Sequence, residues 1–87
     1  MLKIKDVILV ETCGACPEQY DAYIEEHQIG YLRLRHGYFK TLYLSDSEEI
    51  VYEANTKGDG LFDWDEREDH LTKAKEALLT RYLELNS

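Results

Sequence analysis

The sequence lacks any long apolar run and is short of cations, and both deficits restrict what the protein can be. No hydrophobic stretch approaches the about 20 residues that a membrane-spanning helix needs. The chain has 10 Lys and Arg residues against 18 Asp and Glu residues, a net charge of −8. This acidity argues against direct binding to nucleic acid or to an anionic membrane. The first residues also lack an apolar signal region, so we expect a cytoplasmic protein.

Proline and cysteine are also scarce, with 1 proline and 2 cysteines in 87 residues. The length predicts a single domain, residues 1–87, with a thin core. Hydrophobic residues make up 44% of the chain and include 7 tyrosines, which is enough for a folded globule. The apolar run Val7-Ile8-Leu9-Val10 and the tyrosines predict a homo-oligomer, in which a partner subunit covers exposed apolar surface.

The segment from Ile29 to Leu44 predicts a β-hairpin that turns at His36-Gly37. Glycine takes a positive φ without steric cost, and histidine tolerates it better than most residues, so a two-residue turn fits. Side chains alternate between the faces of a strand. One predicted face is typical of a core and carries Leu32, Leu34, Phe39, Thr41 and Tyr43. The other is basic and aromatic and carries Tyr31, Arg33, Arg35, Tyr38 and Lys40, called here the Tyr/Arg face.

The Tyr/Arg face is the best functional signal in the sequence. Arginine offers a planar fork for phosphate or carboxylate, and tyrosine offers a stacking surface and a hydroxyl. A nucleotide-like anion fits that description. The alternative is a solvated sheet face on which arginine stems lie over tyrosine rings for stability alone. No glycine-rich phosphate loop, Ser-His-Asp set or supported pair of catalytic carboxylates stands out, so we expect a non-enzymatic binding protein without a cofactor.

Periodicity predicts the rest of the fold. Strands are expected over residues 3–11, 18–25 and 49–55, and a helix over 65–85. One shared strand face is predicted for Ile50, Tyr52 and Ala54. The apolar stripe of the helix is predicted to contain Leu71, Ala74, Leu78, Tyr82 and Leu85. The expected fold is α+β, an antiparallel β-meander of four to five strands with one C-terminal helix packed on it.

The segment 18–25 fits two periods. Tyr20, Ala22 and Ile24 alternate as in a strand, whereas one face of a helix would also hold Tyr20, Tyr23, Ile24 and His27. We favour the strand because aromatic and β-branched residues dominate and a short polar turn leads directly into the hairpin.

The segment Cys-Gly-Ala-Cys-Pro places Cys13 and Cys16 in a Cys-x-x-Cys motif. A thioredoxin-like redox pair would need more alternating α/β units and a second proline. A zinc site would need two of the three histidines, His27, His36 and His70, none of which has the usual paired spacing. We prefer two small, partly buried thiols, and we expect replacement of both by serine to leave the main function intact.

Two acidic patterns also have a simpler explanation. Residues 55–66 partly follow a twelve-residue calcium loop, with Gly60 sixth and Glu66 twelfth. Lys57 in the third place would repel calcium, which favours an ordinary loop. The acidic run 63–69 could mimic nucleic-acid phosphates and block a basic site on a host protein, or it could be a solvated helix start.

Three segments together resemble a family of small uncharacterised proteins of Gram-positive bacteria and their phages. They are Cys-Gly-Ala-Cys-Pro-Glu-Gln-Tyr-Asp-Ala-Tyr, Ile-Gly-Tyr-Leu-Arg-Leu-Arg-His-Gly-Tyr-Phe, and Gly-Asp-Gly-Leu-Phe before an acidic helix start. The resemblance extends from about Val10 to Leu78 and brings no established activity or site residues. It implies a binding role of the kind that phage counter-defence (anti-defence) factors have. Such a factor either sequesters a signalling nucleotide or blocks a host defence protein. A zinc or thiol module on Cys13 and Cys16 is the third alternative.

Overall fold

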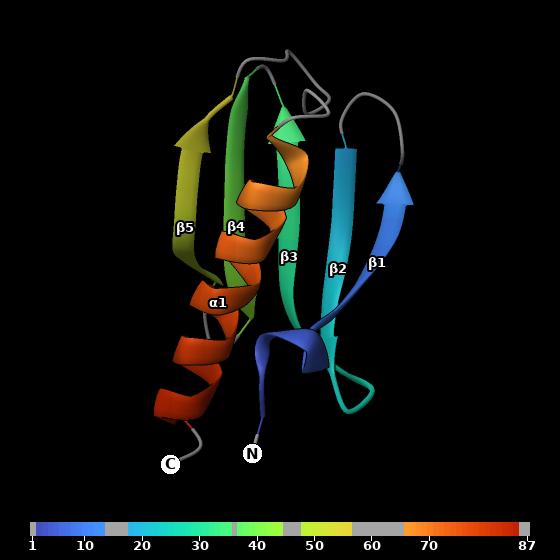
Figure 1. Cartoon of the computed structure of the whole chain (residues 1–87), viewed down its shortest axis with the longest axis vertical. Coiled ribbons are helices and arrows are strands. Elements are labelled where there is room, and N and C mark those ends of the chain that lie inside the picture. Colours follow the sequence, from blue (N-terminus) through green and yellow to red (C-terminus); the bar gives the residue numbers. More distant parts are fainter. Residues whose placement is uncertain (1, 14–17, 36, 45–47, 57–65, 86–87) are drawn as a thin grey trace.

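A five-stranded antiparallel sheet with one helix on a single face forms the molecule (Figure 1). The computed structural model describes residues 2–13, 18–35, 37–44, 48–56 and 66–85. The strands follow one another across the sheet in sequence order: β1 (Ile8–Cys13), β2 (Glu18–Ile24), β3 (His27–Arg35), β4 (Tyr38–Leu44) and β5 (Glu48–Asn55). A short 3-10 helix, η1 (Ile4–Asp6), precedes β1, and α1 (Arg67–Leu85) follows β5. The predicted α+β meander with a C-terminal helix is therefore confirmed.

The β3–β4 hairpin has the predicted register. Arg35 pairs with Tyr38 and Arg33 pairs with Lys40, and Gly37 has a φ of 74°. Because this positive φ is easy only for glycine, the residue type itself fixes the turn. His36 lies outside the described residues.

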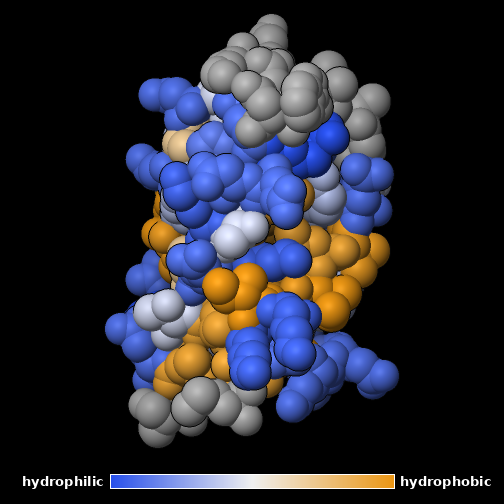
Figure 2. All heavy atoms as spheres, in the orientation of Figure 1, coloured by the Kyte–Doolittle hydropathy of each residue, from blue (hydrophilic) through white to orange (hydrophobic). Residues whose placement is uncertain are grey.

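The core lies between the sheet and α1, which packs over β3, β4 and β5 (Figure 1). All five residues of the predicted hairpin core, Leu32, Leu34, Phe39, Thr41 and Tyr43, are buried. From α1 the buried residues are Ala74, Leu78 and Leu79. A Cβ atom built on Gly30 would lie 2.6 Å from Leu78 Cδ2, so the glycine lets the helix approach the sheet. Figure 2 shows that polar side chains cover much of the helix side, with hydrophobic surface toward β1.

Three details differ from the sequence predictions. The strand expected over 3–11 begins only at Ile8, because the Asp6 carboxylate accepts a hydrogen bond from the Lys3 backbone N–H at 2.7 Å and closes η1. A bulge separates the pairs Thr41–Tyr52 and Leu42–Ile50, so Ile50 and Tyr52 do not share a face. Leu85, expected in the helix stripe, is 48% exposed because it is the last residue of α1.

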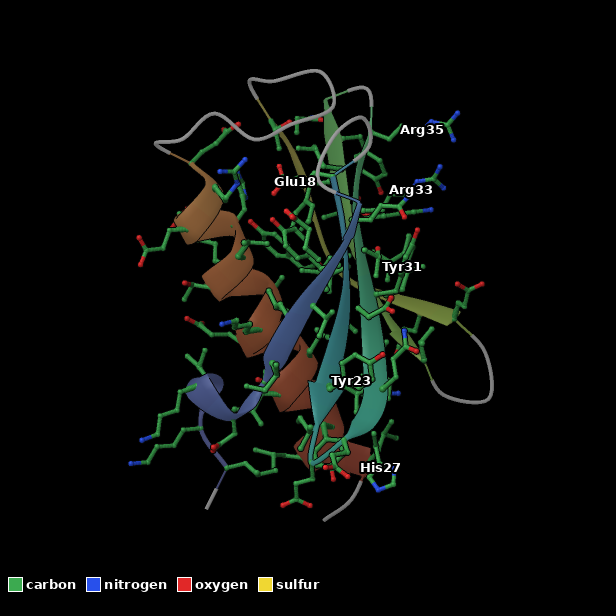
Figure 3. All side chains as sticks on the ribbon, turned by 90° about the vertical axis from the view of Figure 1, so that its right-hand side faces the viewer. Glu18, Tyr23, His27, Tyr31, Arg33 and Arg35 are labelled. Carbon is green, nitrogen blue, oxygen red and sulfur yellow. The ribbon has the colours of Figure 1, made fainter. Side chains whose placement is uncertain are left out.

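The sheet face opposite α1, called here the open face, has no covering element among the described residues. Tyr31, Arg33 and Arg35 point from it away from α1, whereas Glu18 lies on the α1 side (Figure 3). The hairpin end of the open face carries the Tyr/Arg face. No helix in the described parts of the chain is long and apolar enough to cross a membrane.

Candidate functional site

Four of the five residues of the Tyr/Arg face line one surface hollow of about 410 Å³. They are Arg33, Arg35, Tyr38 and Lys40. Strand alternation places the two arginines on one face of β3, and register places the other two residues opposite them on β4. The fifth residue, Tyr31, is half-buried and pairs with Leu42, farther from the hairpin turn.

The cations of this hollow have no carboxylate partner within the described chain. Arg33, Arg35 and Lys40 form no ion pair there, and the buried Arg33 Nε has no hydrogen-bond acceptor. A buried N–H costs free energy unless something outside the described residues accepts a hydrogen bond from it. The other two arginines of the chain, Arg67 and Arg81, both bind glutamates.

One carboxylate borders the hollow and orients a tyrosine. The Tyr38 hydroxyl donates a hydrogen bond to Glu53 Oε2 at 3.1 Å. Partial desolvation and this neighbouring carboxylate raise the pKa of Tyr38, so the hydroxyl stays protonated. The ring of Tyr38, 38% exposed, is therefore held at the edge of the hollow as a surface on which a flat group could stack.

The spacing of the two arginines suits a phosphate group. Arg33 and Arg35 are two residues apart on β3, which places their Cα atoms about 7 Å apart. Their side chains can converge on one phosphate or contact two neighbouring phosphates, and Lys40 adds a third positive charge from β4.

Sequence reasoning missed a buried ionic cluster on the α1 side of the sheet. Glu18 is 1% exposed and accepts two hydrogen bonds from Arg67, from Nε at 3.0 Å and from the guanidinium Nη2 at 3.1 Å. The Tyr20 hydroxyl also donates to Glu18 Oε2. Burial and this carboxylate raise the pKa of Tyr20, and the hydrogen bond to Glu18 raises the pKa of Arg67. The cluster therefore holds the start of α1 against β2. Because the Glu18 carboxylate is buried within it, Glu18 has no role at the surface.

A partial signal for that cluster exists in the sequence. Glu18 stands in phase with Tyr20, Ala22 and Ile24, the buried residues of β2. A glutamate in phase with a core face needs a buried partner, because an unpaired buried carboxylate is costly. The alternation therefore indicates that a cation is required, although it does not identify Arg67.

The histidines and cysteines of the zinc hypothesis either lie far apart or fall outside the described residues. The His70 Nδ1 lies 2.9 Å from the Tyr52 hydroxyl, and its ring packs beside Phe39. His27 begins β3 at the end of the sheet opposite Cys13 (Figure 3). Cys16 and His36 lie outside the described residues. Across the described ranges, no group of three or more His, Cys, Asp and Glu side chains is placed to hold a metal.

Most of the two acidic patterns falls outside the described residues. The calcium-like loop includes residues 57–65, and the acidic run begins within them. In the described part of the acidic run, Glu66 Oε2 lies 3.8 Å from His70 Nε2 and Asp69 pairs with Lys73 at 3.0 Å. Part of the run therefore serves contacts within the helix start.

Comparisons with protein-family models, with curated proteins and with solved structures found no match.

Proposed function

We propose that this protein is a non-enzymatic binding protein that holds a small phosphate-bearing anion, of nucleotide type, in the hollow of the Tyr/Arg face. The observation that carries the proposal is the buried Arg33 Nε, for which the described residues offer no acceptor, beside Arg35 and Lys40, which form no ion pair among those residues. In a chain with 18 carboxylates and 10 cations, three neighbouring cations that have no partner among the described residues are unexpected unless a ligand supplies the negative charge.

The ligand would be recognised by short-range contacts. The guanidinium groups of Arg33 and Arg35 donate to phosphate oxygens, Lys40 adds charge, and Tyr38 stacks on the base or sugar. The net charge of −8 opposes long-range attraction of an anion. Binding is therefore expected to depend on contact geometry, and a ligand with a flat group is preferred over inorganic phosphate.

The biological role proposed here is sequestration. Removal of a signalling nucleotide from the host would make this a counter-defence protein, in keeping with the resemblance to phage proteins. Binding without turnover is sufficient for that role, and the described lining of the hollow, Arg, Lys and Tyr side chains, supplies groups that bind anions and flat rings.

Native mass spectrometry of the purified protein, alone and after incubation with a panel of nucleotides, tests the proposal. Wild-type protein is expected to retain a nucleotide, and the double variant Arg33→Ala with Arg35→Ala is expected to lose it. The matched control is Lys3→Ala with Lys5→Ala, which removes two charges at exposed positions near η1. Wild-type protein that stays free of every nucleotide would refute the proposal, as would equal retention by the arginine double variant.

A further inference from the structure

The half of the open face beyond the Tyr/Arg hollow is apolar. Cross-strand pairing defines two adjacent rows of side chains there. The middle row contains Val10, Asp21, Tyr31, Leu42 and Ile50. Nearer the β2–β3 turn, Ile8, Tyr23 and Gln28 pair across β1, β2 and β3, and Leu44 pairs with Glu48 across β4 and β5; these five residues are called here the lower row. Three aliphatic residues in these rows are strongly exposed: Ile8 at 54%, Val10 at 47% and Ile50 at 49%. Four of the five residues of the middle row are apolar or aromatic, and a predominantly apolar surface of this kind marks a candidate interaction site.

We propose that a second copy of this chain covers this apolar half, face to face, about a two-fold axis that crosses the strands between the two rows. Each lower row then packs on the partner's middle row. Ile8 meets the partner's Val10, and Leu44 meets the partner's Leu42. Glu48 faces the partner's Ile50, and Asp21 faces the partner's Tyr23, so no two carboxylates of these rows oppose each other.

Charge selects this orientation over the alternative. The row above the apolar half contains Arg33 and Lys40 in its centre, with Gln19 and Glu53 on either side, and Glu25 and Glu26 form the exposed turn below it. In the proposed dimer, the basic row of each copy lies over the partner's acidic turn. A two-fold axis along the strands would instead place Arg33 over the partner's Arg33 and Arg35 over the partner's Arg35, which like-charge repulsion opposes.

The dimer covers part of the ligand hollow, because Arg33 and Lys40 line the hollow and also face the partner. Arg35 and Tyr38 lie one row farther toward the hairpin turn than Arg33 and Lys40, beyond the edge of the partner. A nucleotide held by Arg33 and Lys40 is therefore expected to compete with the dimer, and the dimer does not depend on the ligand.

The size of the contact predicts a weak, reversible dimer. Five strands at about 4.8 Å spacing give a width of about 24 Å, and the overlapping rows extend about 20 Å along the strands. Such a contact lies toward the small end of specific interfaces, so we expect dissociation in the micromolar range.

Sedimentation equilibrium of the full chain over a range of micromolar concentrations tests the dimer. Wild-type protein is expected to shift from a mass of 10.2 kDa toward twice that mass as its concentration rises. Val10→Glu places a carboxylate in the apolar contact of each copy, and it should weaken association at least about 100-fold. Leu83→Glu makes the same kind of change at an exposed leucine of α1, 43% exposed, and should leave association unchanged.

A charge swap tests the orientation. Glu25→Lys with Glu26→Lys should weaken the dimer, and the added change Arg33→Glu with Lys40→Glu should restore it. A monomer at every concentration, or Val10→Glu association equal to wild type, would overturn the dimer. Failure of the swap to restore association would overturn the orientation. Nucleotide retention by Val10→Glu is a separate readout, so the dimer and the ligand proposal can fail independently.

Discussion

The two faces of the sheet handle buried charge in opposite ways. On the α1 side, the carboxylate of Glu18 is fully buried and accepts hydrogen bonds from Arg67 and Tyr20. On the open face, Arg33 has a buried Nε with no acceptor in the described chain, next to Arg35 and Lys40 without ion pairs. One face satisfies its charge internally, and the other leaves charge available for something outside the chain.

This contrast separates structural charge from functional charge. A buried ion pair that is complete within the chain holds two elements together, and its loss should affect stability. Cations left without partners contribute little to the folded state, because nothing in the described chain depends on their charge. Substitutions on the two faces should therefore change different properties, and the predictions below test that separation.

The largest effect is expected for a leucine between α1 and the sheet. Leu78→Ala removes a fully buried side chain and should lower the free energy of unfolding by about 3 kcal/mol, through lost burial and the cavity left behind. Ile50→Ala on the open face, where the side chain is 49% exposed, should cost less than about 1 kcal/mol. Urea unfolding at low protein concentration compares the two variants without a contribution from dimerisation. Equal losses would contradict the contrast between the faces.

A slightly smaller effect is expected when the buried carboxylate is removed. Glu18→Ala leaves Arg67 and Tyr20 without their acceptor and should cost about 2–3 kcal/mol, less than for a fully buried pair because Arg67 is 43% exposed and can turn to water. The open-face control is Glu53→Ala, which should cost less than about 0.5 kcal/mol. Thermal unfolding followed by circular dichroism measures both changes, and a Glu18→Ala protein as stable as wild type would refute the structural role.

Alkaline pH should weaken the α1 side before it affects the open face. Burial and Glu18 raise the pKa of Tyr20 above its usual 10.0, so the folded state holds the phenolic proton more tightly than the unfolded state. This contribution to stability is complete below about pH 10 and is lost as the pH rises above it, at up to about 1.4 kcal/mol per pH unit. Urea unfolding of wild type, Tyr20→Phe and Tyr38→Phe between about pH 8 and pH 11 should show a reduced slope for Tyr20→Phe, with a smaller change for the exposed Tyr38→Phe. Identical slopes in all three proteins would contradict this assignment.

Local patterns in the sequence were enough to predict much of the fold. Alternation and a glycine turn predicted the β3–β4 register and the buried side of the hairpin, because both depend on neighbouring residues. The helix stripe was predicted for the same reason, apart from Leu85 at its end. The strand over 3–11 was partly wrong because the Lys3–Asp6 contact closes η1, and Ile50 was misplaced because alternation alone cannot reveal a bulge.

Contacts between distant residues account for what the sequence did not show. Glu18 and Arg67 are 49 residues apart, and no periodicity links them. The Tyr52–His70 contact likewise joins β5 to α1. The residues of the candidate site were predictable as a group because they lie on one hairpin. That the Arg33 Nε is buried and has no acceptor in the described chain emerged only once the packing around it was known.

Calorimetric titration of nucleoside monophosphates and the matching nucleosides tests the central claim most directly. Wild-type protein should bind a monophosphate and bind its nucleoside far more weakly. Arg33→Ala with Arg35→Ala should weaken monophosphate binding at least about 10-fold while the free energy of unfolding changes by less than about 0.5 kcal/mol. Unchanged affinity in the double variant, or its unfolding, would contradict the claim that the open face carries charge for a ligand rather than for the fold.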